Sequence, residues 1–165
     1  MTPLKLAALD AEDLEILSSH SQDAVVKVGD ISWLKSEHRL VIAMHRFAWE
    51  QALSQKKGLF APKPTYERRQ SVLHFDQVLG VQARNIKMQA KDAVLNLLAI
   101  TFESEGEGPG GNVTLVFAGD AELRLKVDCI ESQLADAGSA WETENLPEHE
   151  AAETFEELLK DQPQA

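Results

Sequence analysis

The stretch GNVTLVFAGDAELRLKVDCIESQLADAGSAW, residues 111–141, contains the most regular pattern in the chain. In its first half, apolar residues alternate with polar or small ones on both sides of a Gly119-Asp120 pair. These apolar residues are Val113, Leu115 and Phe117 before the pair and Leu123, Leu125 and Val127 after it. A period of two interrupted by turn-forming residues predicts a β-hairpin. The second strand carries its charges on the face opposite its leucines, which predicts one face in water and one face buried under a helix.

Beyond Asp128 the spacing changes, because apolar residues now lie three or four positions apart at Ile130, Leu134 and Ala137. This spacing predicts an α-helix over residues 129–137 with Asp128 as its N-cap. Ile130 and Leu134 are expected to face the open end of one curved β layer. The predicted unit is therefore strand, turn, strand and helix.

Length and composition place the chain among ordinary globular proteins. Its 165 residues, 44% hydrophobic and 26% charged, are enough for one domain that buries a core without disulfides or metals. One cysteine excludes an internal disulfide, and charges in the opening residues interrupt any signal-peptide pattern, so a cytoplasmic location is expected. No apolar run approaches the roughly 20 residues that span a bilayer, so membrane insertion is not expected.

Charge is distributed unevenly along the chain. The formal net charge is −11, which disfavours nonspecific binding to nucleic acid. Residues 142–165 hold eight acidic residues and one lysine, a local charge of −7, whereas residues 35–69 hold eight Lys or Arg and three Glu, a local charge of +5. We therefore expect a single globular domain over residues 1–141 and a flexible acidic tail over residues 142–165.

The rest of the chain predicts a mostly β fold. An apolar opening at residues 4–9 suggests an edge strand, and Asp10 is a natural N-cap for a helix that ends near His20. Residues 51–66 have the composition of a long surface loop. Five strands are predicted before the hairpin, at residues 24–34, with a bend at Gly29-Asp30, and at residues 39–49, 68–75, 78–84 and 94–103. The prediction is thus seven strands followed by a helix.

Several segments together resemble a known family. They are QDAVVKVGD at residues 22–30, RLVIAMHRFAWE at residues 39–50, the strand that begins with Arg68-Arg69, and the hairpin segment described above. Over about residues 4–141 or a little beyond, the chain resembles an uncharacterised bacterial family of unknown function, DUF2948, which has no assigned activity and therefore implies no site. The order of elements also resembles the pleckstrin-homology fold. That resemblance implies an α+β, mostly β domain, in which a bent antiparallel sheet of seven strands is closed by a C-terminal helix and the first strand and helix are additions.

One group of basic residues is a candidate site for an anionic ligand. The group consists of Arg46, Arg68, Arg69, His45, Lys56 and Lys57. If the strands at residues 39–49 and 68–75 pair, several guanidinium groups could share one face and bind a carboxylate or phosphate. One alternative is that these residues are solvated strand ends paired with Glu50 and Glu67. Another is that the basic segment of residues 35–69 binds the acidic tail of residues 142–165.

Other reactive residues have a structural interpretation beside the functional one. His45 and His74 could form a proton-transfer pair, or each could be a hydrogen-bonded packing residue. Cys129 could be an activated thiol, or a small core residue. The sequence contains no spacing typical of metal ligands, so no metal or cofactor is predicted.

These observations favour a non-catalytic binding or adaptor module that recognises a protein partner or an anionic group. The alternatives are a small enzyme that uses the strand histidines with nearby arginines, and a structural subunit of a larger assembly. An open strand edge would favour pairing with a strand of a partner. The sequence does not predict an oligomeric state.

Overall fold

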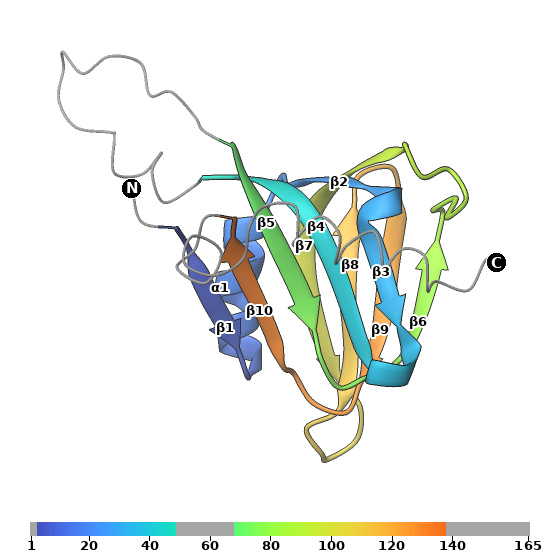
Figure 1. Cartoon of the computed structure of the whole chain (residues 1–165). Coiled ribbons are helices and arrows are strands. Elements are labelled where there is room, and N and C mark those ends of the chain that lie inside the picture. The colour runs from blue at the N-terminus through green and yellow to red at the C-terminus, as the bar shows by residue number, and fades with distance from the viewer. Residues whose placement is uncertain (1–2, 49–67, 138–165) are drawn as a thin grey trace, which may run out of the picture.

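The computed structural model describes residues 3–48 and 68–137 (Figure 1). Within these residues the chain forms ten β-strands, one α-helix and two short 3₁₀ helices. In chain order they are β1 (Lys5–Ala8), α1 (Ala11–Ser21), β2 (Val25–Lys27), η1 (Val28–Asp30), β3 (Ile31–Leu34), η2 (Lys35–Glu37), β4 (Arg39–Phe47), β5 (Arg68–Phe75), β6 (Val78–Arg84), β7 (Val94–Ser104), β8 (Gly111–Phe117), β9 (Ala121–Val127) and β10 (Ser132–Asp136). The loop predicted at residues 51–66 and the acidic tail predicted at residues 142–165 lie outside the described residues.

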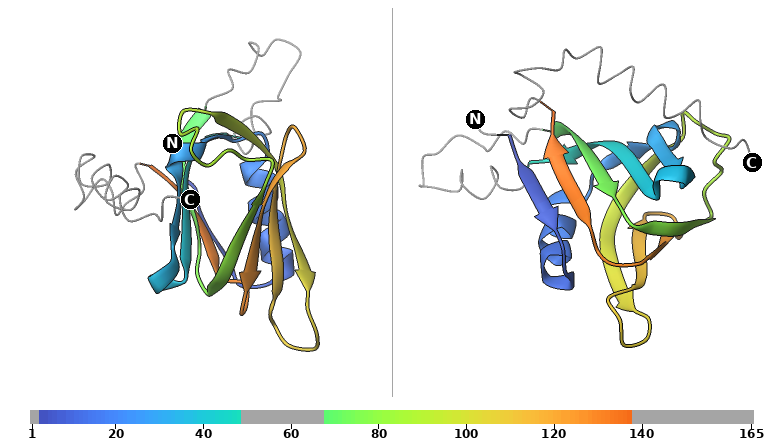
Figure 2. Two further views of the ribbon diagram at one scale, coloured as in Figure 1. Left: turned by 90° about the vertical axis from the view of Figure 1, so that its right-hand side faces the viewer. Right: turned by 60° about the horizontal axis from the view of Figure 1, so that its bottom comes forward.

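All ten strands belong to one antiparallel sheet. Its order is β1-β10-β5-β4-β2-β7-β8-β9-β6, and β3 pairs with β4 beside this path. The sheet bends so that β1, β10, β5, β4 and β3 form one layer and β7, β8, β9 and β6 form the other (Figures 1 and 2). The ends of the sheet do not pair with each other, so β1 and β6 are edge strands. The prediction of a mostly β, α+β antiparallel fold is confirmed.

The predicted hairpin is confirmed as β8 and β9, which pair from Gly111–Val127 to Phe117–Ala121. Gly119 and Asp120 form the turn with positive φ angles of 81° and 58°, a backbone conformation that Gly and Asp tolerate better than most residues. The alternating apolar side chains of both strands are buried, and they form the centre of one layer of the core.

The helix predicted over residues 129–137 is wrong, because β10 occupies this segment and pairs with β1 on one side and β5 on the other. A spacing of four fits a strand as well as a helix, since residues 130 and 134 lie on the same face under a period of two. Ile130 and Leu134 are indeed buried, with 6% and 0% exposure, and the alternate residues Ser132 and Asp136 are buried beside them. The seven strands followed by a helix, on which the pleckstrin-homology comparison depended, are therefore not the order of this chain.

The predicted strand over residues 24–34 is two short strands, β2 and β3, separated by the 3₁₀ turn η1 at the expected Gly29-Asp30 bend. β2 bridges the two layers because it pairs with both β4 and β7. β3 pairs only with β4 among the described strands.

Helix α1 is the one α-helix among the described residues, and it packs mainly against β7 and β1. Asp10 is its N-cap and accepts a hydrogen bond from the N–H of Asp13 at 2.8 Å, as predicted. Leu14 and Leu17 are buried against β7 and β1. The N–H of Ile100 in β7 donates to the hydroxyl of Ser18 at 2.8 Å, so the helix provides an acceptor to β7 beyond the residues that pair with β2. The described residues contain no helix with the length and apolar character needed to cross a lipid bilayer.

Candidate functional site

The strands that carry the predicted arginine cluster pair as expected, since β4 and β5 are antiparallel neighbours. Arg46 lies opposite Arg69, and Phe47 lies opposite Arg68. Neighbours along a strand point to opposite faces, so Arg46 and Arg69 share the inner face, whereas Arg68 and His45 are on the outer face. The register therefore brings together two of the three arginines and separates the third.

Arg46 is fully buried, and its guanidinium group makes a two-bonded ion pair with the carboxylate of Asp136. Nε donates to Oδ1 and Nη2 donates to Oδ2, both at 2.7 Å, and Nη1 donates to the carbonyl of Phe47 at 3.2 Å. Asp136 also accepts from the hydroxyl of Ser71 at 2.6 Å and from the N–H of Leu4 at 2.8 Å. This network joins β4, β5 and β10 to the residue before β1, which favours a structural role for Arg46 over ligand binding.

The environment of Asp136 keeps its carboxyl ionised. Burial by itself would raise the pKa of Asp136, but the hydrogen bonds from Arg46, Ser71 and Leu4 stabilise the charged form. The net result is a pKa below the ordinary value. The buried cation and the buried anion therefore neutralise each other within the described part of the protein.

Of the remaining members of the predicted cluster, Arg68 and His45 lie on the outer face. Arg68 is exposed and donates to the carbonyl of Asp23 at 3.3 Å. Lys56 and Lys57 lie outside the described residues. The register thus places Arg46 and Arg69 on the inner face and Arg68 and His45 on the outer face, and whether the set binds an anion stays a prediction.

His45 and His74 lie on the outer face but far apart. His45 is opposite Gln70 in the β4–β5 register, and His74 is four residues further along β5. At about 3.3 Å per residue this spacing corresponds to roughly 13 Å, which is too far for direct proton transfer between the two rings.

His74 instead belongs to a charged group at the end of β5. Its Nε2 lies 3.6 Å from Oδ2 of Asp76, and Oδ1 of the same carboxylate accepts from Nε of Arg39 at 2.6 Å. Burial lowers the pKa of His74; Asp76 and Glu131 act in the opposite direction, and Arg39 reinforces the lowering. His74 is therefore held toward its neutral form, in which one ring nitrogen can accept a proton.

Two other predictions concern a reactive residue and metal binding. Cys129 is half-buried. A core residue would be fully buried and a reactive thiol would be exposed, so this burial favours neither interpretation. In the described ranges no three or more His, Cys, Asp or Glu side chains gather in a way that could hold a metal ion.

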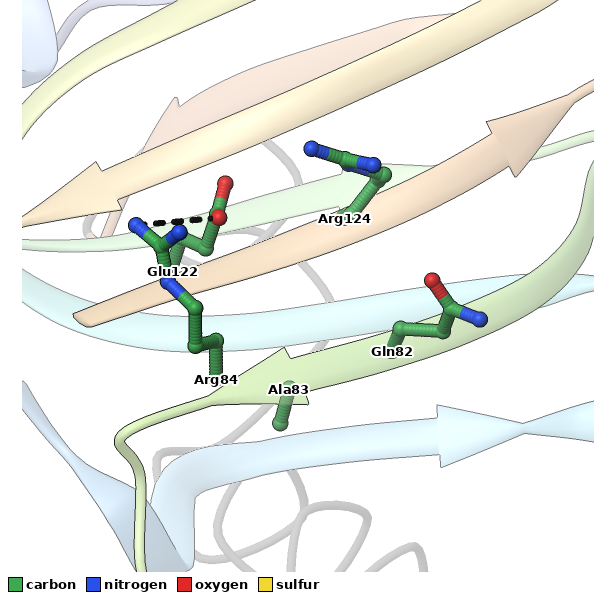
Figure 3. A pocket seen from close by; sticks show the side chains of 5 residues that line it. All are labelled: Gln82, Ala83, Arg84, Glu122 and Arg124. Carbon is green, nitrogen blue, oxygen red and sulfur yellow. Dashed lines mark ion pairs between the residues drawn. The ribbon is translucent and has the colours of Figure 1, made fainter.

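An open pocket of about 540 Å³ lies on the outer face of β6 and β9 (Figure 3). It is lined by Gln82, Ala83, Arg84, Glu122 and Arg124. Gln82 is opposite Arg124 and Arg84 is opposite Glu122 in the register, so these four side chains share one face of the two strands.

The two arginines of this pocket differ in their partners. Nη2 of Arg84 lies 3.1 Å from a carboxylate oxygen of Glu122 and 3.1 Å from one of Asp120 (Figure 3 shows the first pair). Arg124 is exposed and makes no ion pair with any residue that the structure describes. The alternation of residues predicted only that Arg124 is a charged residue on a solvent-exposed face. Its place beside Gln82 depends on the pairing of β6 with β9.

The edge beside this pocket is also open. β6 pairs with β9 alone among the described strands, and its register shifts at a β-bulge between Val78 and Gly80. Leu79, within the bulge, is 51% exposed. The N–H of Val78 donates to the carbonyl of His38 at 2.9 Å, so only the start of the outer edge is occupied.

Comparison with known proteins identifies a family. The model of the family described as "Protein of unknown function (DUF2948)" matches residues 4–149. A search of the curated proteins and a search of the solved structures found no match. The match covers nearly the whole chain and ends a little beyond residue 141, which confirms the predicted resemblance. The chain therefore belongs to the DUF2948 family.

Proposed function

We propose that this protein is a non-catalytic binding module that recognises an acidic group of a protein partner on the outer face of β6 and β9. The observation that carries the proposal is the exposed guanidinium of Arg124, which stands beside Gln82 in an open pocket without an ion-pair partner among the described residues. A cytoplasmic location is part of the proposal, since the single Cys129 cannot form an internal disulfide.

The chemistry of the pocket suits a carboxylate. Arg124 can donate two parallel N–H bonds to it, and the amide of Gln82 can donate another. Glu122 does not compete strongly for Arg124, because its Oε1 already contacts Arg84. The pocket is open to water, so we expect binding that is weak for an isolated anion and that weakens further with added salt.

The test uses the full chain and a blocked hexaglutamate peptide, with inorganic phosphate as a second probe. Peptide binding is followed by the chemical shift of the Arg124 Nε–H and by fluorescence anisotropy. We expect Arg124→Ala to weaken binding about tenfold, equivalent to about 1.4 kcal/mol for a charge-assisted contact. Lys126→Ala is the matched control, because Lys126 is the next outward-facing cation on β9 and does not line the pocket.

The proposal is wrong if Arg124→Ala and the unmodified chain bind the peptide equally, or if Lys126→Ala weakens binding as much as Arg124→Ala does. Binding of phosphate without binding of the peptide would also overturn it, because the proposed ligand is a group of a protein.

The alternative function is a small enzyme, and its support is the group around His74. This ring is held toward its neutral form beside Asp76 and Arg39, an arrangement that could serve a general base. A metabolite screen that detects turnover in the full chain, and loss of that turnover in His74→Gln, would favour the enzyme over the binding module.

A further inference from the structure

We propose that the open edge of β6 accepts an extended segment of the partner protein as an additional strand, and that this segment alternates acidic with apolar residues. This inference rests on the proposed function, because the acidic residues of the added strand would be the groups that Arg124 recognises. It specifies that the partner binds as an extended strand, which the pocket alone does not indicate.

The hydrogen-bonding pattern leaves the outer edge available. The carbonyl of Gln77 accepts from the N–H of Asp128 in the neighbouring segment, whereas Val78 turns its N–H away to His38. Groups in an antiparallel pair alternate between facing the partner strand and facing outward. Beyond the bulge, the register therefore directs the N–H and C=O groups of Val81 and Ala83 away from β9. These are the groups that an added strand would pair with.

The two faces of β6 define the side chains of the added strand. Val81 and Ala83 lie opposite the buried Leu125 and Leu123, yet Val81 is only half-buried and Ala83 is exposed. Apolar residues of an added strand would cover them. On the other face, the neighbours of the added strand are Gln82 and Arg84, with Arg124 one strand further away. Acidic residues on that face would meet the cations of the pocket.

The length of the free edge limits the size of the segment. The bulge and the bond from Val78 to His38 occupy its beginning, which leaves residues 81–84 as the regular part. At about 3.3 Å per residue this part spans roughly 13 Å, which matches a segment of about four or five residues. Such a short addition needs side-chain contacts as well as backbone hydrogen bonds, because each net hydrogen bond contributes little.

Charge favours a separate acidic segment over a second copy of this chain. If two β6 edges paired with each other, Arg124 of each copy would gain no carboxylate, because Glu122 and Asp120 already contact Arg84. An acidic segment places opposite charges there.

The test uses the full chain and a labelled peptide in which valine alternates with glutamate, flanked by solubilising residues. We expect Val81→Pro to weaken binding about tenfold, because proline removes the outward N–H while remaining compatible with an edge strand. Val81→Thr, which keeps the N–H, should bind within about threefold of the original chain. A peptide in which lysine replaces glutamate should not bind.

A second measurement does not depend on the proline variant folding. Bound peptide should slow the amide hydrogen exchange of Val81 and Ala83 in the unmodified chain about tenfold or more, and should leave the N–H groups of Lys5–Ala8 at the other edge unchanged. Concentration-dependent slowing at Val81 without peptide would assign the edge to a second copy and overturn the inference.

The outcomes separate this inference from the proposed function. If Arg124→Ala weakens binding but Val81→Pro does not, and exchange at Val81 and Ala83 is unchanged, acidic recognition stands and strand addition is wrong. If neither variant changes binding, both proposals are wrong.

Discussion

The buried ion pair between Arg46 and Asp136 gives the sharpest prediction for stability. Asp136→Asn keeps the shape of the side chain and an oxygen that can accept from Leu4, but it removes the charge that neutralises Arg46. The guanidinium group is 0% exposed, so the variant would keep a buried cation beside a neutral side chain in place of the carboxylate of Asp136. Breaking such a pair costs about 3–5 kcal/mol, a large part of the roughly 5–15 kcal/mol that stabilises a typical domain.

A second substitution tests whether the loss of stability comes from the buried charge of Arg46. Adding Arg46→Met to Asp136→Asn removes the cation while preserving most of its volume, so the double variant should be more stable than Asp136→Asn alone, by about 1–3 kcal/mol. Urea unfolding of the full chain, followed by tryptophan fluorescence, measures both free energies. If Asp136→Asn costs less than about 1 kcal/mol, or if the second substitution lowers stability further, the ion pair does not have this role.

Three further predictions concern the stability of other parts of the described structure. The pKa of His74 is lowered in the folded state, so the free energy of unfolding should fall as pH drops below the unfolded pKa of about 6.5 and should level off below the folded pKa. In urea unfolding measured at several pH values, His74→Gln should lack this loss. Gly111→Ala should cost about 1–3 kcal/mol, since a Cβ would overlap the backbone carbonyl of Glu103 and lie 2.8 Å from the ring of Phe102, whereas Gly80→Ala, with open space around it, should be nearly neutral. Ser32→Ala should be neutral or stabilising in thermal unfolding, because among the described residues its buried hydroxyl has no hydrogen-bond partner; a loss above about 1 kcal/mol would contradict this.

The hairpin and the first helix were predictable because their signals are local. The turn at Gly119-Asp120 and the N-cap Asp10 act within a few residues, and the structure confirms both. The segment at residues 129–137 was different. Its apolar spacing fits a helix and a strand equally, and the choice depends on β1 and β5, which are distant in sequence and offer backbone partners on both sides.

The sites depended on distant residues even more. Arg46 and Asp136 are 90 positions apart, and nothing near Arg46 in the sequence indicates that its guanidinium group will bind a carboxylate. The alternation around Arg124 did predict an exposed charge, but the pocket exists only because β6 pairs with β9 in a register that places Gln82 opposite it. The alternation on β9 therefore identified side chains that face water, whereas the burial of Arg46 and the meeting of Arg124 with Gln82 depended on strand pairing.

The position of β1 has a consequence for how the protein is made. Its strand partner within the described residues is β10, about 125 residues later in the chain, so a nascent chain leaving the ribosome exposes β1 and α1 long before their packing surface exists. Completion of this fold is thus expected to wait until β10 has been synthesised and to be slow, as for other topologies dominated by distant contacts. The amino-terminal segment is the part of the nascent protein for which protection by a chaperone would matter most.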